Sequence, residues 1–196
     1  MRTIHPKYGF ISDRKYILRE VIRLKDMAVD FANKTRLTNI KSAFIPNTRS
    51  QVYFLEFNDF YKDLPDLLYK SRNGRIYKDN EEKFSFFVES SLETLKKLFW
   101  VPDVIIFNDW QTSLLPFLLQ KRIKNDSWFK NIKTVFFLHS NSPSYNFSNK
   151  LFEKLDIEYN KRKTSQNLME LAINNSDFTF VFDDFKDKKI KTLLKG

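Results

Sequence analysis

The second half of the chain alternates short apolar runs with amphipathic segments. The apolar runs cover residues 101–107, 132–138 and 178–182. They are continuously apolar near their ends, which is typical of strands buried on both faces of a parallel sheet. Residues 110–123 and 164–174, between these runs, are predicted to be helices. The order of strands and helices predicts an α/β fold with crossover helices.

A long amphipathic helix is predicted just before the first of these strands. Its apolar residues recur at three- and four-residue spacing and form one face: Phe84, Phe87, Val88, Leu92, Leu95, Leu98 and Phe99. Asp79 or Asn80 can cap the first turn, where backbone N–H groups lack partners. Lys96 and Lys97 in the last turn suit the negative end of the helix dipole.

The first eighty residues carry a weaker pattern. Residues 2–5 predict a short strand, and residues 51–55 predict a clearer one. The apolar positions of residues 16–31 fit neither the helical nor the strand period cleanly, and strands are favoured there. Residues 57–80 contain several turn-forming residues, which indicates a loop-rich segment before the long helix.

Composition excludes several classes of function. The chain has 196 residues, no cysteine and two histidines. Disulfides and thiolate zinc sites are therefore excluded, and neither a metal nor another cofactor is expected. No run of eighteen apolar residues occurs, so no membrane span is expected. The first residues lack the features of a signal or transit peptide, which makes a cytoplasmic protein the default expectation.

The net charge of +10 suits an anionic partner but does not identify one. Basic residues are spread along the chain in pairs, such as Lys96-Lys97 and Lys188-Lys189, and are not gathered in one stripe. No recognised nucleic-acid-binding module occurs, so nucleic acid is not favoured as a partner. A glycine-rich phosphate loop is absent as well, which argues against a self-contained dinucleotide or P-loop site.

Polar residues follow each of the three apolar runs. Asn108–Gln111 follow the first, His139–Ser142 the second, and residues 183–184 the third. Ligands of open α/β sheets bind at the carboxyl ends of the strands, so these clusters form the candidate site. Structural roles are the alternatives. Asp109 can be a helix cap worth ~1 kcal/mol, and His139 can be a hydrogen-bonded structural imidazole.

Five segments share their order and spacing with the motifs of one enzyme family. They are Pro6–Gly9 (P-x-Y-G), Gln51–Leu55 (V-Y-F-[IL]), Asp79–Phe87 (D-N-x-x-R-F-x-x-F), Pro102–Pro116 (P-D-[IV]-[IV]-H-x-[HN]-D-W-[QH]-[TA]-x-L-x-P) and Lys133–His139 (K-x-V-x-T-[IV]-H). In these segments the chain resembles the bacterial glycogen synthase and plant starch synthase family. The resemblance runs from about Pro6 to His139 and fades towards Asp183.

The resemblance implies an incomplete Rossmann-like parallel-sheet domain, the N-terminal half of a GT-B fold. It implies a retaining glucosyltransferase that moves glucose from ADP-glucose, or sometimes UDP-glucose, to the non-reducing end of an α-1,4-glucan without a metal. Tyr77 and Asn80 match family residues beside the glucose. Asp109 matches the aspartate of H-D-W, and His139 matches the histidine that contacts the transferring glucose near its 6-hydroxyl. Asp109 and His139 are thus the expected catalytic residues.

The chain also departs from the family pattern. It has Phe107-Asn108-Asp109-Trp110 where the family has H-x-H-D-W, and His139-Ser140 where the family has H-N. Residues 1–196 are expected to be a single partial catalytic domain that lacks the first strand, its K-x-G-G-L loop and the second GT-B domain. The chain is then a fragment or truncated form that is inactive alone. The alternative is a non-catalytic α/β module that binds glucan or a nucleotide sugar, or complements a partner chain.

The expected loss of one strand predicts self-association. In the family, that strand lies between the strands that match residues 2–5 and 101–107. Its loss would leave two rows of backbone groups unpaired. We expect the isolated chain to be marginally stable and to aggregate or dimerise through these sheet edges unless the two strands pair directly.

Overall fold

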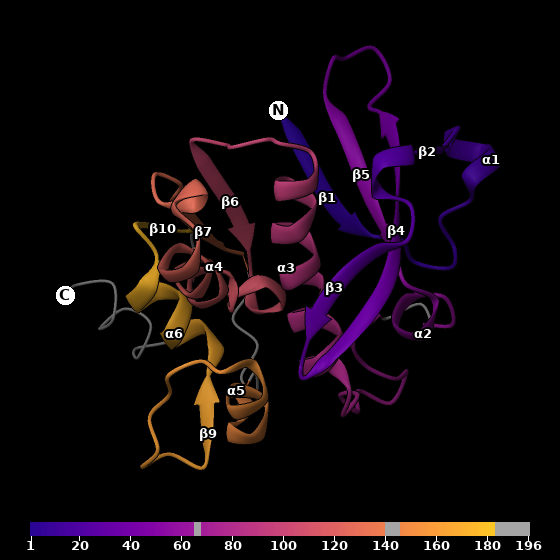
Figure 1. The fold of residues 1–196 in the computed structure, drawn as a ribbon. Helices are drawn as coiled ribbons and strands as arrows, with labels where there is room; N and C mark the ends of the chain where they lie inside the picture. Colours follow the sequence, from indigo (N-terminus) through magenta and orange to yellow (C-terminus); the bar gives the residue numbers. More distant parts are fainter. Residues whose placement is uncertain (65–67, 140–145, 183–196) are drawn as a thin grey trace. The chain divides into compact units, whose positions relative to one another are not determined.

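The structure is a computed structural model that describes residues 1–64, 68–139 and 146–182 (Figure 1). The chain divides into two compact units, unit 1 (Met1–Trp100) and unit 2 (Val101–Gly196). The expectation of a single partial domain stays a prediction. The candidate residues 140–142 and 183–184 lie outside the described residues.

Unit 1 is built on a mixed sheet. Its strands are β1 (Arg2–Pro6), β2 (Arg19–Glu20), β3 (Met27–Phe31), β4 (Lys34–Phe44) and β5 (Gln51–Glu56). The sheet order is β1-β5-β4-β2, with β3 paired to β4, and β1 runs parallel to β5 while the other pairs are antiparallel. The strands predicted at residues 2–5 and 51–55 are therefore confirmed.

Parts of unit 1 differ from the prediction. Residues 16–31 contain β2 and β3, as favoured, together with a 3₁₀ turn at Ile22–Leu24. Strand β4 was not predicted, because its alternation is interrupted by polar residues, and its pairing on both sides holds it in the sheet. The loop-rich segment contains the short helix α2 (Asn58–Tyr61), and α1 (Asp13–Tyr16) follows β1.

Helix α3 (Asn80–Lys97) confirms the predicted amphipathic helix. Phe86 on this helix is fully buried, and its ring contacts the rings of Phe31, Phe57 and Phe60. The predicted apolar face is wrong at Phe99, which is 77% exposed, because the helix has ended and Phe99 adopts a left-handed backbone conformation with φ 51°.

The expected cap of α3 is only half right. Asp79 occupies the N-cap position, but its side chain makes no capping hydrogen bond. Its carboxylate pairs instead with Lys83 Nζ, one turn along the helix, at 2.8 Å. The negative charge of Asp79 therefore lies near the positive end of the helix dipole, although its side chain forms no capping hydrogen bond.

Unit 2 contains the predicted parallel sheet. Its strands are β6 (Val104–Asn108), β7 (Lys133–Leu138) and β10 (Phe178–Val181), in the order β10-β7-β6. Both neighbouring pairs are parallel. Strand β6 begins later than predicted, after Pro102, which has no N–H to donate to a ladder.

The helices of unit 2 begin later than predicted. A 3₁₀ turn (Trp110–Thr112) precedes α4 (Leu115–Asn125), and another 3₁₀ turn (Ser127–Phe129) follows it. A hairpin of β8 (Asn146–Ser148) and β9 (Ser165–Asn167) encloses α5 (Asn149–Leu155), and α6 (Leu168–Asn175) follows. The predicted helix at residues 164–174 starts only at Leu168, because Asn167 is its N-cap and accepts from the Glu170 N–H at 3.0 Å.

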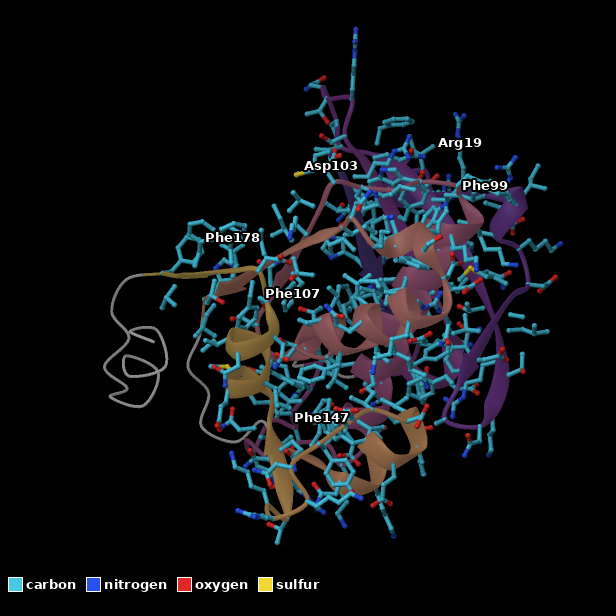
Figure 2. All side chains as sticks on the ribbon, turned by 60° about the vertical axis from the view of Figure 1, so that its left-hand side comes forward. Arg19, Phe99, Asp103, Phe107, Phe147 and Phe178 are labelled. Atoms are coloured by element: carbon cyan, nitrogen blue, oxygen red, sulfur yellow. The ribbon has the colours of Figure 1, made fainter. Side chains whose placement is uncertain are left out.

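The parallel sheet is buried on one face only. Phe107, Phe136 and Leu138 are buried, and α4 and α6 of the same unit also carry buried apolar residues. On the other face, the central strand β7 has the half-buried Val135 and Phe137. Four residues of the outer strands β6 and β10 on that face are 46–59% exposed: Val104, Ile106, Phe178 and Phe180. Figure 2 labels one residue of each kind, the buried Phe107 and the exposed Phe178. The expectation of burial on both faces is therefore wrong for these strands.

The described residues include no helix with the length and apolar character needed to span a bilayer.

Candidate functional site

The ends of β6 and β7 bring three predicted site residues together. Asn108 is the last residue of β6 and lies opposite Phe137 in the parallel register. The His139 backbone N–H, just after β7, donates to Asp109 Oδ1 at 2.8 Å. His139 Nε2 lies 2.8 Å from Asn108 Oδ1. The prediction that the two polar clusters meet at one sheet edge is confirmed for these residues, while their roles stay predictions.

Asp109 has an unusual backbone conformation. Its φ of 53° and ψ of −174° fall in a region that is nearly restricted to glycine and costs about 1–3 kcal/mol for other residues. The Asp109 N–H donates to the Phe137 carbonyl at 2.9 Å, and its carboxylate accepts from His139. These bonds to β7 hold the strained conformation and direct the carboxylate across the strand ends.

The alternative role of Asp109 as a helix cap is not supported. Asp109 occupies the N-cap position of the 3₁₀ turn Trp110–Thr112, but its side chain makes no capping hydrogen bond. Its backbone carbonyl accepts from Ser113 Oγ at 3.2 Å instead. The Asp109 carboxylate accepts from the His139 N–H at the end of the neighbouring strand. Trp110, which follows Asp109, is a buried packing residue whose ring is perpendicular to that of Phe147.

The His139 ring lies at the end of a row of aromatic rings. Its centroid is 4.4 Å from that of Phe182, with an interplanar angle of 16°. The rings of Phe137 and Phe180 are also stacked, at 5.2 Å. Both His139 and Asn108 are exposed. The site therefore presents an imidazole, an amide and a carboxylate at the surface beside an aromatic face, a combination that suits a ligand with several hydroxyl groups.

The other two predicted residues belong to unit 1. Asn80 is 3% exposed, and its Nδ2 donates to the Tyr69 carbonyl at 2.7 Å. Its Oδ1 is buried with no hydrogen-bond partner among the described residues. Tyr77 is half-buried, and its ring lies 5.5 Å from Lys83 Nζ. The predicted set of four thus falls into two pairs, one in each unit.

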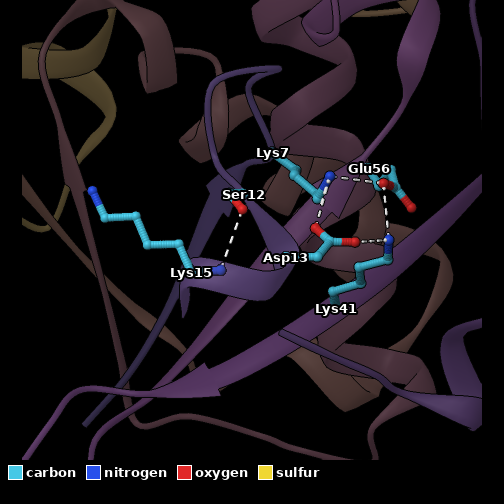
Figure 3. Close-up of polar contacts among 6 residues, drawn as sticks. All are labelled: Lys7, Ser12, Asp13, Lys15, Lys41 and Glu56. Carbon is cyan, nitrogen blue, oxygen red and sulfur yellow. Dashed lines mark hydrogen bonds and ion pairs between the residues drawn. The ribbon is translucent and has the colours of Figure 1, made fainter. Parts of the chain in front are cut away.

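A second polar cluster follows β1 and was not predicted from the sequence (Figure 3). Lys7 Nζ lies 3.1 Å from Asp13 Oδ1 and 3.0 Å from Glu56 Oε1. Lys41 Nζ lies 2.6 Å from Asp13 Oδ2 and 3.2 Å from Glu56 Oε1. The four residues come from separate segments, so no local motif marks them. Two cations and two carboxylates balance each other, which indicates a structural network.

The charges of this network oppose the effect of burial. Burial alone would raise the pKa of Asp13, but the hydrogen bonds and charges of Lys41 and Lys7 outweigh it and lower the pKa below 3.8. Burial alone would lower the pKa of Lys41, but Asp13 and Glu56 outweigh it and raise that pKa. Both shifts favour the charged forms, so the network is ion-paired at neutral pH.

The described residues hold no group of three or more histidine, cysteine or carboxylate side chains that could bind a metal ion.

Comparison with known proteins decides the family. Residues 1–192 match the family described as the starch synthase catalytic domain. The chain belongs to this family. It is 40% identical over 154 residues to the glycogen synthase of Chlorobium limicola, covering 79% of this chain and 31% of that protein. It is 36% identical over 181 residues to the glycogen synthase of Chlorobium luteolum, covering 90% and 37%.

A solved member of the starch synthases has the same fold. The catalytic domain of starch synthase IV from Arabidopsis thaliana, bound to ADP and acarbose, matches with a TM-score of 0.71. The match covers 90% of this chain and 36% of that chain at 19% identity. The expected family and α/β fold are therefore confirmed. The chain spans about a third of the length of the glycogen synthases it matches.

Proposed function

We propose that the chain is part of a glucosyltransferase of the glycogen and starch synthase type. The reaction moves glucose from ADP-glucose to the non-reducing end of an α-1,4-glucan with retention of configuration. The observation that carries the proposal is the hydrogen-bonded group of Asn108, Asp109 and His139 at adjacent strand ends, in a chain of this family. The related starch synthase bound to ADP and acarbose supports a nucleotide donor.

The proposed chemistry is the positioning of a sugar. Rigid strand ends hold the His139 imidazole and the Asp109 carboxylate, which can orient glucose hydroxyls while positive charge grows at the anomeric carbon. The Phe182 ring restricts the tilt of the imidazole, and the ladder between β6 and β7 limits the movement of Asp109. The proposal includes no metal cofactor.

Tyr77 and Asn80 are proposed as further substrate-binding residues. The buried Asn80 Oδ1 lacks a hydrogen-bond partner among the described residues, which costs about 1–3 kcal/mol if it stays unsatisfied. A donor from a bound sugar hydroxyl or water would satisfy it. The other half of the amide is held by the Tyr69 carbonyl, so the orientation of Oδ1 is fixed.

Two experiments test the transferase proposal. The 196-residue chain alone is expected to incorporate no labelled glucose from ADP-glucose into glycogen, because it spans about a third of its relatives. Incorporation above a blank would contradict this. The chain is then joined to the remaining part of a Chlorobium glycogen synthase, and glucose transfer is measured. Activity is expected, whereas a non-catalytic module would bind glucan and still transfer no glucose.

In the joined enzyme, His139→Ala is expected to lower kcat more than it raises KM. A contact to the reacting sugar strengthens in the transition state, so its loss affects the chemical step. Asn175→Ala is the matched control, since its amide donates to the Leu171 carbonyl within α6, away from the strand ends that hold His139. An unchanged kcat in His139→Ala would return His139 to a structural role.

We also propose that the isolated chain self-associates through its sheet edges. In the described part of the chain, β1 is hydrogen-bonded to β5 alone and β6 to β7 alone. Ile106 on β6 is exposed, which adds apolar area beside an open edge. Sedimentation of the wild type should show dimers or larger species, and Ile106→Lys should shift them towards monomer. A monomeric wild type would contradict the proposal.

A further inference from the structure

Asn108 holds the His139 ring from the neighbouring strand. The amide Oδ1 lies 2.8 Å from Nε2 of the imidazole. One face of the same ring stacks on Phe182. Within the described residues, Nδ1 of His139 has no hydrogen-bond partner. The ring is therefore held through one nitrogen and one face, and its second nitrogen is left for a ligand or solvent.

Asn108 is itself held in place on both sides of its backbone. Its N–H donates to Thr112 Oγ1 at 3.0 Å, and its carbonyl accepts from the same hydroxyl at 2.7 Å. The parallel pairing of β6 with β7 places Asn108 opposite Phe137. The amide therefore approaches His139 from a fixed backbone, which is the condition for one side chain to orient another.

We propose that Asn108 is a positioning residue that sets the tautomer and the plane of the His139 imidazole. A carboxamide oxygen only accepts hydrogen bonds, so the neutral ring carries its proton on Nε2. Nδ1 is then an acceptor and can take a hydrogen bond from a sugar hydroxyl. The last step rests on the proposed function, whereas the tautomer and ring orientation do not.

The tautomer is measured by long-range ¹H–¹⁵N NMR of the 196-residue chain. The chain has only His5 and His139, and a His139→Gln variant assigns the two sets of signals. The expected result is a proton on Nε2 of His139 that exchanges slowly with water. If the amide is turned so that its NH₂ group donates to Nε2, the proton will be found on Nδ1, and the proposal is overturned.

Variants at Asn108 test the contact directly. Asn108→Ala and Asn108→Leu both remove the hydrogen-bond acceptor, but their side chains differ in volume. If one variant fails to fold, the other can still be measured. In both, the Nε2–H signal is expected to lose its protection from exchange. Asn108→Asp keeps an acceptor and should retain the protected signal, and Asn175→Ala is the control. Equal protection in the wild type, Asn108→Ala and Asn108→Leu overturns the proposal.

Kinetics of the joined enzyme separate this inference from the proposed function. Asn108→Ala is expected to lower kcat about tenfold to a hundredfold, because a misplaced contact group costs that much, and Asn108→Asp should recover much of the loss. If the NMR signal changes and kcat does not, Asn108 still positions the ring, and the proposed sugar contact of His139 is wrong. If kcat falls without any NMR change, the positioning role is wrong.

Discussion

The segments that follow β1 and β6 are both polar, yet they are organised in different ways. After β1, Lys7 and Asp13 join Lys41 and Glu56 in a closed network of two cations and two carboxylates. Every charge there faces an opposite charge from the same unit. The network fastens the segment after β1 to the sheet.

The segment after β6 is organised by hydrogen bonds to the end of a neighbouring strand. The Asp109 carboxylate accepts from the backbone N–H of His139, just after β7, and the Asn108 amide faces the exposed His139 imidazole. Asp109 also keeps a backbone conformation that is costly for a residue with a side chain. Polar residues that follow a strand therefore do not all have the same role. Mutual neutralisation indicates a structural role, whereas strain and exposed polar groups indicate a ligand site.

The largest expected effect is on the stability of the parallel sheet in unit 2. It tests whether only one face of that sheet is covered. Phe136→Ala should lower the free energy of unfolding by about 3–5 kcal/mol, because Phe136 is fully buried. Phe180→Ala, on the exposed face of the same sheet, should cost less than about 1 kcal/mol. Urea unfolding measures both. Equal losses would mean that the open face is covered in solution.

The next effect concerns the segment after β1. A Cβ at Gly9 would lie 1.9 Å from the Lys62 carbonyl oxygen, a backbone atom that cannot move aside easily. Gly9→Ala is expected to cost about 3 kcal/mol. Gly74→Ala is the control, because Gly74 has φ +83° but open space around it, so only a conformational cost of about 1 kcal/mol applies. Thermal unfolding measures both variants. A larger loss of stability in Gly74→Ala than in Gly9→Ala would contradict the close approach of Gly9 to the Lys62 carbonyl.

Backbone strain at Asp109 makes a smaller difference. Asp109→Ala and Asp109→Gly both remove the carboxylate that accepts from His139, but only glycine relieves the φ of 53°. The glycine variant is expected to be more stable than the alanine variant by about 1–2 kcal/mol. Equilibrium unfolding of the two variants measures this difference directly. Equal stabilities of the two variants would show that the Asp109 backbone is not strained. Strain would then no longer distinguish the segment after β6 from the segment after β1.

The smallest effect is on the acid side of the stability profile. The lowered pKa of Asp13 means that its contribution is fully present above pH ~4 and is lost as pH falls through the folded-state pKa. Asp177 behaves alike: burial alone would raise its pKa, but Lys133 and Thr134 outweigh burial and lower it. Asp13→Asn and Asp177→Asn should each flatten the loss of stability in acid. Both carboxylates are partly exposed, so the changes are modest.

Urea unfolding at a series of pH values, from neutral to about 2, measures these slopes. Unchanged slopes in Asp13→Asn would show that the network after β1 does not stabilise the folded chain. The Lys41 pKa is raised, so its contribution should be lost only as pH rises above its usual value of 10.5.

Several elements were determined by the sequence alone. Strands β1, β5, β6, β7 and β10 and helix α3 were predicted because each carries an apolar pattern that is complete within a few residues. The proximity of Asp109 to His139 was also predictable, since parallel strands end at the same edge of a sheet. The family followed from motif order and spacing.

Other features were decided only by the tertiary structure. Strand β4 depends on partners on both sides, and Lys41 within it meets Asp13 from 28 residues away. The strained backbone of Asp109 is held by bonds to β7 that no local pattern encodes. The buried Asn80 Oδ1 is likewise a consequence of packing around α3. Local patterns determine which segments become strands and helices, whereas charge pairing, strain and burial arise where distant segments meet.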